Sequence, residues 1–527
     1  MQNGMTEGPA GGPEPRVAAL LVGGLMVAAL AAAAWPGAAA AQEPGADPRG
    51  LTLDVVEDTL PNGLRVLVLR RAGTPTASLV LRFDVGSVNE RLGETGIAHF
   101  LEHLLFKGTT TVGTANVRRE RELFVLMDAA HDSLLGARGR RDRVEETRLA
   151  GRIRALEERA RELVRANEFD RLLTEAGARD LNATTSYEST TYYAQLPANR
   201  VELWFVLEAD RMANPVFREF YAERDVVAEE RRSRLETTPG GRLLEEFYAA
   251  AYRVHPYGVP VIGHMSDIQA YTRAQVADYH RRFYRPNNAV LSVVGDVDPR
   301  QILRWAHRYF GPIPAGEEPP PVLAEEPEQT GERRIEVAFE AEPELLVGWH
   351  VPHGRHDDAP ALSVLARILA GGKTGRLYRR LVEQDRLATS VTASTGPGFA
   401  GPQLFMIAAQ PLGGHGTAEL EAAIYAELDR LREAPPTERE IQRVRNQLEA
   451  GEVHRLSSNF GLAFQLVESA AVHGDWRETF RTADRLAAVG APDVLRVAAT
   501  YLVRSNRTVA TLVRPAGADA MATGGRP

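Results

Sequence analysis

The chain has 527 residues, no cysteine and only two lysines, Lys107 and Lys373. The absence of cysteine excludes disulfides, lipoprotein processing and thiolate metal sites, so any metal must be held by histidine and carboxylate ligands. Arginine therefore supplies nearly all the positive charge, a bias that we attribute to codon usage. The formal net charge of -8 argues against nucleic acid as the main partner.

One long apolar run lies near the N-terminus and is typical of an export signal. A positive charge precedes the run, which covers residues 17–34, and small residues follow it. Ala39 and Ala41 form a good cleavage pattern. The pattern predicts that residues 1–41 are a signal peptide, cut before Gln42. We therefore expect a periplasmic or secreted protein with no membrane span after cleavage; an uncleaved anchor is the alternative.

Composition and length indicate a globular protein of several domains. The chain is 44% hydrophobic and 25% charged, and its length predicts two to four domains. Residues 311–332 are rich in Pro and Glu, which predicts an extended linker. The linker would separate a domain of residues 51–310 from one of residues 333–515, and residues 516–527 would be a disordered tail.

Two internal patterns refine this division. The order of predicted strands and helices after the linker repeats the order at the start, and the last strand, residues 506–513, echoes residues 287–294. Between residues 117 and 172, Arg and Glu are abundant, Leu and Ile recur at helical spacing, and opposite charges lie three and four residues apart. We predict a protruding helical hairpin with salt-bridged faces. Its basic stretch, residues 138–143, is interpreted as a solvated turn rather than as a site for an acidic partner.

The most informative motif is His-x-x-Glu-His, formed by His99, Glu102 and His103 within a helical apolar stripe. Histidines four apart on a helix project from one face, about one turn apart. Such a pair can chelate a metal that takes nitrogen ligands at tetrahedral angles, which means zinc first. Glu102 then lies where it can take a proton from a water molecule that the metal activates. This order of residues is the inverzincin signature.

A catalytic zinc with two histidines needs a third protein ligand. The charged helix predicted over residues 220–236 offers Glu223 and Glu230, which are seven apart and therefore share a face. From the residues alone, either carboxylate can ligate while the other acts nearby, and a solvated surface helix is the alternative.

Five segments in order resemble the M16 metallopeptidases (pitrilysin, insulysin, mitochondrial processing peptidase). They are GIAHFLEHLLFKGT, NATTSYESTTYY, ERDVVAEE, HPYGVPVIG and YRPNNAVLSVVGDV. The resemblance implies an α+β fold of two homologous domains, each a mostly antiparallel sheet flanked by helices, with zinc in the first. The interval from His103 to Glu230 is longer than is usual in the family; the helical hairpin, inserted into the first domain, accounts for the difference.

The resemblance also implies roles for single residues. His99, His103 and Glu230 would be the Zn²⁺ ligands. Glu102 would activate water, and Glu223 would support a ligand or assist catalysis. The implied activity is that of an exported zinc-dependent endopeptidase or oligopeptidase.

The family lays its substrate on an edge strand, and Asn182, Ala183 and Thr184 match that strand. An extended peptide would add to the edge through backbone hydrogen bonds, which read little sequence. The substrates expected are therefore unfolded or short peptides of broad sequence.

One departure from the family pattern bears on the assembly. Catalytic members carry an Arg and a Tyr, seven apart in the second domain, that bind the substrate carbonyl and stabilise the oxyanion. Val382 and Thr389 stand at the matching positions here. We therefore expect the zinc-bearing subunit of a two-component enzyme, whose homologous M16 partner supplies the Arg and Tyr, and otherwise a homodimer.

Other interpretations stay open at this point. A non-catalytic assembly or scaffold subunit is one alternative, and a dedicated maturase for a single peptide is another. The nearby side chains that can substitute for the missing pair are Arg376, Tyr378, Arg379 and Arg380.

Overall fold

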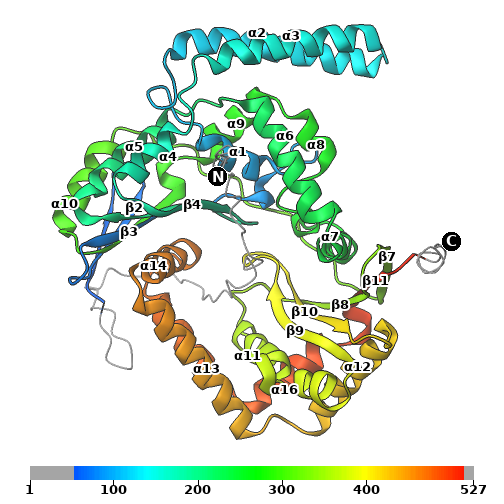
Figure 1. Ribbon diagram of the computed structural model, residues 1–527. Coiled ribbons are helices and arrows are strands. Elements are labelled where there is room, and N and C mark those ends of the chain that lie inside the picture. The colour runs from blue at the N-terminus through cyan, green and yellow to red at the C-terminus, as the bar shows by residue number, and fades with distance from the viewer. Residues whose placement is uncertain (1–52, 516–527) are drawn as a thin grey trace, which may run out of the picture.

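The computed structural model describes residues 53–515; the predicted signal peptide (1–41) and tail (516–527) lie outside the described residues. Two β-sheets, each flanked by helices, occupy the two halves of the chain (Figure 1). The predicted α+β fold of two homologous domains with mostly antiparallel sheets is confirmed. Among the helices of the described residues, none is long and apolar enough to cross a membrane.

The first sheet has six strands in the order β1-β2-β6-β3-β5-β4. The strands are β1 (Val55–Thr59), β2 (Arg65–Arg70), β3 (Thr76–Phe83), β4 (Arg179–Thr185), β5 (Thr190–Pro197) and β6 (Ala289–Gly295). β2 and β6 run parallel, and the other neighbours run antiparallel. Every residue of β6 is buried, as expected for a strand covered on both faces.

The second sheet has five strands in the order β7-β11-β8-β10-β9. They are β7 (Arg333–Ala338), β8 (Glu344–Val351), β9 (Ala388–Gly396), β10 (Gln403–Pro411) and β11 (Arg507–Val513). β7 and β11 run parallel and the other neighbours antiparallel, which repeats the pattern of β2-β6-β3-β5-β4. β11 therefore holds the place of β6, as the sequence echo between them predicts.

Ten α-helices lie in the first half and six in the second, within the described residues. The first ten are α1 (Ile97–Leu105), α2 (Val117–Gly139), α3 (Arg143–Arg161), α4 (Glu168–Glu175), α5 (Val201–Ala213), α6 (Phe220–Arg231), α7 (Pro239–Ala251), α8 (Met265–Ala270), α9 (Arg273–Phe283) and α10 (Pro299–Trp305). The others are α11 (Ala359–Ala370), α12 (Thr417–Glu433), α13 (Glu438–Ser457), α14 (Asn459–His473), α15 (Glu478–Ala488) and α16 (Ala491–Tyr501). The helix predicted over 220–236 is α6 followed by a π-helical turn, Arg232–Glu236.

Each half contributes one helix to the sheet of the other half (Figure 1). Leu243 and Phe247 of α7 pack against the second sheet, where Gly348 leaves room for the Phe247 ring. A Cβ atom at Gly348 would lie 2.5 Å from that ring. Leu466 of α14 packs in return against β6 of the first sheet, beside Val290. Because each fully buried Leu or Phe stabilises the fold by about 1.5–3 kcal/mol, this exchange holds the two halves together.

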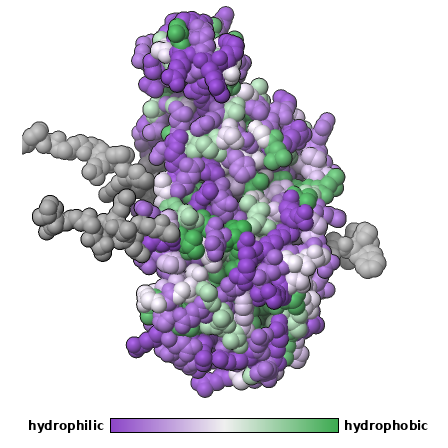
Figure 2. Space-filling view, turned by 90° about the vertical axis from the view of Figure 1, so that its right-hand side faces the viewer, coloured by the Kyte–Doolittle hydropathy of each residue, from purple (hydrophilic) through white to green (hydrophobic). Residues whose placement is uncertain are grey.

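The predicted helical hairpin is formed by α2 and α3, which lie side by side and project from the body (Figure 1). Asp128 of α2 accepts hydrogen bonds from Tyr221 (2.9 Å) and Arg273 (3.2 Å), and the His131 ring stacks on Tyr221. These contacts fix the near part of the hairpin to α6 and α9. Figure 2 shows its far end as a mostly hydrophilic knob above the body.

Candidate active site

Helix α1 is fixed at its start by backbone geometry and by a half-buried carboxylate. Gly96 precedes the helix at a φ of +88°, and a Cβ there would lie 2.2 Å from the Ile262 carbonyl oxygen. The Glu90 carboxylate accepts hydrogen bonds from the backbone N–H groups of Gly96 (2.7 Å) and Ala98 (2.9 Å). The apolar face of α1 is buried, which leaves its two histidines on the flank.

The structure brings His99, His103 and Glu230 together, with their ligand atoms all within 4.8 Å of one another. The Nε2 atom of His99 lies 3.8 Å from Glu230 Oε1, and that of His103 lies 3.4 Å from Oε2. Two nitrogens and a carboxylate oxygen at this spacing fit a tetrahedral zinc ion, whose ligand atoms lie about 3.3 Å apart. The buried Nδ1 of His99 has no hydrogen-bond partner among the described residues.

Glu223 lies behind His103, on the opposite side of the ring from Glu230. Its Oε1 is 2.9 Å from His103 Nδ1, and its Oε2 is 2.6 Å from the Lys107 ammonium. A carboxylate on the second ring nitrogen fixes the orientation and tautomer of a ligating histidine. The structure thus places Glu223 against the Nδ1 side of His103 and Glu230 in the cluster.

The two histidines have opposite pKa shifts. Burial, and next the nearby charge of His103, lowers the pKa of His99 to about 3, which keeps its imidazole neutral. Burial acts in the same direction on His103, but hydrogen bonds to Glu223 and Glu230 outweigh it and raise the pKa of His103 to about 9. Burial would raise the pKa of Glu230, yet the histidines lower it to about 2, so this carboxylate is ionised.

Glu102 belongs to α1 and is buried against β4, with 8% of its surface exposed. Its Oε2 accepts a short hydrogen bond from the hydroxyl of Thr185, the last residue of β4. Burial raises the pKa of Glu102, while the Thr185 hydrogen bond opposes the shift. A carboxylate with a raised pKa is suited to general base catalysis near neutral pH.

Strand β4 is the edge of the first sheet. Asn182, Ala183 and Thr184 pair with β5 on one side, opposite Tyr193, Tyr192 and Thr191. On its other side β4 has no strand partner among residues 53–515. Its outer N–H and C=O groups can therefore accept an extended peptide as an additional strand.

The two positions that depart from the family pattern offer no strong donor. Val382 packs against the apolar core of the second half. The Thr389 hydroxyl donates a hydrogen bond to the Gln410 carbonyl at 3.2 Å. Of the nearby substitutes, Arg376 forms an ion pair with Glu440 at 2.8 Å, so its guanidinium is engaged within the second half.

Three side chains near the cluster were not assigned a role from the sequence. Lys107 contacts Glu223, and Arg234 lies 2.9 Å from Glu230 Oε1. Each cation lies four residues after a motif residue, His103 or Glu230, and helical i,i+4 spacing could have found both. Thr185, the third, comes from a separate strand, and no local spacing relates it to the motif.

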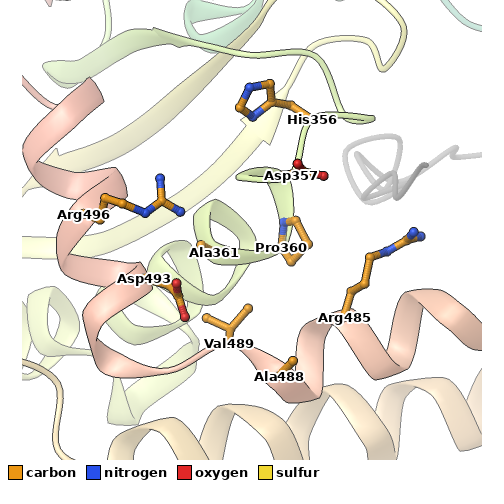
Figure 3. Close-up of a pocket in the computed structure, with 9 residues that line it drawn as sticks. All are labelled: His356, Asp357, Pro360, Ala361, Arg485, Ala488, Val489, Asp493 and Arg496. Carbon is orange, nitrogen blue, oxygen red and sulfur yellow. The ribbon is translucent and has the colours of Figure 1, made fainter. Parts of the chain in front are cut away.

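A separate cavity of about 290 Å³ lies in the second half, between α11, α15 and α16 (Figure 3). Arg485, Asp493 and Arg496 line it together with apolar side chains. Arg496 is engaged by Asp358 at 2.6 Å, and the lining includes no residue of the histidine cluster. We assign no site to this cavity.

Comparison with known families matches both halves of the chain. The family described as "Insulinase (Peptidase family M16)" matches residues 65–124 and 162–264. The family described as "Peptidase M16 inactive domain" matches residues 270–448. The unmatched interval between 124 and 162 falls within α2 and α3, as expected for an inserted hairpin.

Individual proteins match over most of the chain. A zinc protease, PqqE, from Helicobacter pylori is 30% identical over 416 residues, which cover 77% of this chain and 81% of that protein. The crystal structure of a protease from Helicobacter pylori superposes with a TM-score of 0.74 at 26% identity, covering 88% of this chain and 100% of that one. The periplasmic protease PqqL from Escherichia coli shares the fold, with a TM-score of 0.65 at 18% identity; 90% of this chain covers 49% of PqqL.

Proposed function

This chain belongs to peptidase family M16, and from that premise we propose that it is an exported zinc-dependent endopeptidase or oligopeptidase of unfolded peptides. The observation that carries the proposal is the convergence of His99, His103 and Glu230 on one point, with Glu102 on the same helix. The relative named zinc protease supports the metal, and the periplasmic neighbour supports export.

The residues that would hold the zinc are His99, His103 and Glu230, with Glu223 orienting His103. When bound, zinc supplies a Lewis acid that lowers the pKa of water and polarises the scissile carbonyl. Glu102 accepts the proton of the attacking water and then delivers it to the nitrogen of the leaving amine. Because Thr185 occupies Oε2 of Glu102, the Oε1 atom is left to carry that proton.

The substrate would lie along the outer edge of β4, beside Asn182, Ala183 and Thr184. Its backbone would continue the sheet, and only an extended segment can do this, so folded proteins are not substrates. Glu102 contacts the end of the same strand through Thr185, and this contact supports a peptide position beside the proposed general base.

We propose a two-component enzyme, because Val382 and Thr389 cannot supply the donors of the family pattern. A homologous M16 subunit would contribute the Arg and the Tyr, and a homodimer is the alternative assembly. The length of PqqL, about twice the span that this chain matches, is consistent with two such units working together. In the proposed division of this chain, residues 51–310 form the domain that contains the catalytic site. Residues 311–332 form the linker, and residues 333–515 form the second domain.

The test is hydrolysis of fluorescein-labelled casein, an unfolded protein, by the exported chain alone and with its homologous subunit. We expect activity that a chelator abolishes and Zn²⁺ restores, and that Glu102→Gln removes without loss of bound zinc. The absent donors at Val382 and Thr389 favour one rival, a non-catalytic scaffold subunit. A purified chain that binds no zinc would support that rival and contradict the peptidase.

A further inference from the structure

Arg234 lies next to the histidine cluster, on the π-helical turn that follows α6. Its guanidinium is 2.9 Å from Oε1 of Glu230, the oxygen that faces His99. The Arg234 side chain is 55% exposed, whereas that of Glu230 is 16% exposed. The cation therefore sits at the solvent side of the cluster, where a substrate would arrive.

The guanidinium of Arg234 has more hydrogen-bond donors than its described contact uses. An arginine carries five N–H donors, and the described contacts assign the Arg234 side chain one partner, Glu230. The neighbouring arginines bind other carboxylates: Arg231 binds Glu236 and Glu245, and Arg232 binds Glu229. The remaining N–H groups of Arg234 are free to bind an oxygen of a peptide.

Lys107 is the other cation in contact with the site, but it lies on the opposite side. Its ammonium binds Glu223 at 2.6 Å and lies 3.6 Å from Glu219, behind His103. The Lys107 side chain is 24% exposed, less than half the value for Arg234. Its position suits it to neutralise Glu223 rather than to meet substrate.

We propose that Arg234 is a catalytic residue, which binds the oxygen of the scissile carbonyl and the negative charge that develops on it. The inference rests on the proposed peptidase function and deepens it. Arg234 would supply, within this chain, a donor of the kind that Val382 and Thr389 lack. The chain alone then has a basal rate, and a partner subunit that brings further donors raises it.

The oxygen of water adds to the carbonyl carbon, the π electron pair moves to the carbonyl oxygen, and Glu102 takes the proton. Arg234 donates a hydrogen bond to that oxygen and keeps its own proton. The electron pair then returns, the C–N bond breaks, and the proton on Glu102 passes to the amine nitrogen.

The experiment compares wild type with Arg234→Gln, Arg234→Lys and the matched control Arg232→Gln. Arg232 is exposed, lies two residues away and pairs with Glu229, so its loss leaves the cluster intact. Three readouts are needed for the zinc-loaded chain: kcat and KM on a synthetic peptide with a casein sequence, zinc affinity by chelator competition, and affinity for a phosphinic analogue of that synthetic peptide. The phosphinic group presents a tetrahedral anion in place of the scissile bond.

We expect Arg234→Gln to lower kcat by about a hundredfold and to weaken phosphinic peptide binding by a similar factor. KM and zinc affinity should stay within about threefold, and Arg234→Lys should recover part of the rate because it restores a point charge without the planar fork. Arg232→Gln should match wild type.

Two results would overturn the assignment. An unchanged kcat would remove Arg234 from the reaction, and a loss of zinc affinity equal to the loss of kcat would reduce it to a support for Glu230. Failure of the proposed function looks different: wild type cleaves no peptide. In that case phosphinic peptide binding still decides, since a loss in Arg234→Gln supports the assignment and no loss, or no binding by wild type, contradicts it.

Discussion

Thr185 donates a hydrogen bond to the carboxylate of Glu102, and this contact joins the edge strand β4 to the helix that carries both histidines. The two residues are separated by 83 positions in the chain. The strand proposed to hold the peptide therefore also holds the proposed general base, so a shift of β4 displaces Glu102.

Removal of the Thr185 hydroxyl tests the contact between Thr185 and Glu102. Thr185→Val keeps the shape of the side chain but leaves Glu102 without its donor, and hydrogen bonds to charged groups contribute about 1.5–3 kcal/mol. We expect kcat to fall about tenfold or more at unchanged zinc content. Ser186→Ala, which alters the adjacent turn, is the control and should retain full activity; equal rates for both variants would contradict the role of Thr185.

Glu223 should control the affinity for zinc rather than the rate of the hydrolytic step. Glu223→Gln keeps the size of the side chain but weakens its hold on His103 Nδ1, and loss of such a partner typically costs 10–100-fold in metal affinity. Competition with a chromophoric chelator measures the change. Glu219→Gln is matched to it, because Glu219 contacts Lys107 at 3.6 Å and is not bonded to either histidine; it should shift the zinc affinity by less than about threefold.

The contact between Arg82 and Glu468 should stabilise the docking of the two halves. Arg82 is buried in β3, and Glu468 of α14 binds it at 2.6 Å. Glu468→Gln removes the negative charge that faces the buried Arg82 guanidinium. We expect it to lower the free energy of unfolding, measured in urea, by about 1–3 kcal/mol. The exposed pair of Glu145 and Arg148 is the contrast, and Glu145→Gln should change that free energy by less than about 1 kcal/mol.

His280 makes stability depend on pH. Burial, and next the charge of Arg285, lowers the pKa of His280 to about 3, against 6.5 for an exposed histidine. Between these values the unfolded chain binds a proton that the folded chain does not, so the free energy of unfolding falls as pH drops from 6.5 toward 3. The slope approaches about 1.4 kcal/mol per pH unit for this one group.

Replacement of this histidine isolates its contribution. His280→Phe retains an aromatic ring beside Tyr284 but cannot titrate, so its curve of unfolding free energy against pH should be flatter than that of wild type. An equal slope in His280→Phe and wild type would show that other groups cause the acid sensitivity.

The far part of the hairpin should be dispensable for peptide hydrolysis. Joining α2 to α3 by a short turn in place of residues 134–154 keeps Asp128 and His131, which attach the hairpin to the body. We expect kcat/KM per bound zinc to stay within about twofold, because an insertion in a loop need not disturb the site. A large loss would assign the hairpin to substrate handling.

Much of this arrangement is visible in the sequence, because it depends on local spacing. The i,i+4 spacing of His99 and His103 and the seven-residue spacing of Glu223 and Glu230 each predict one shared helix face, and in the structure both carboxylates contact His103. Helical periodicity likewise predicts the hairpin, and the likeness of residues 287–294 to 506–513 predicts the matching places of β6 and β11.

Other features depend on contacts that spacing does not encode. An amphipathic pattern shows that α7 and α14 each bury a face, but it does not say which sheet receives it. The predicted helix over 220–236 changes to a π-helical turn at Arg232, where Arg231 bonds to Gly263 and Glu245 in other segments. Tertiary contacts such as these override local helical preference.

The exchange of α7 and α14 makes the chain one folding unit despite its duplicated architecture. Either half, cut away at the linker, would present a sheet face stripped of its covering helix and would also carry an unpaired apolar helix of its own. The two halves are thus complementary pieces rather than autonomous modules, so neither the half with the histidine cluster nor the other is expected to remain folded on its own.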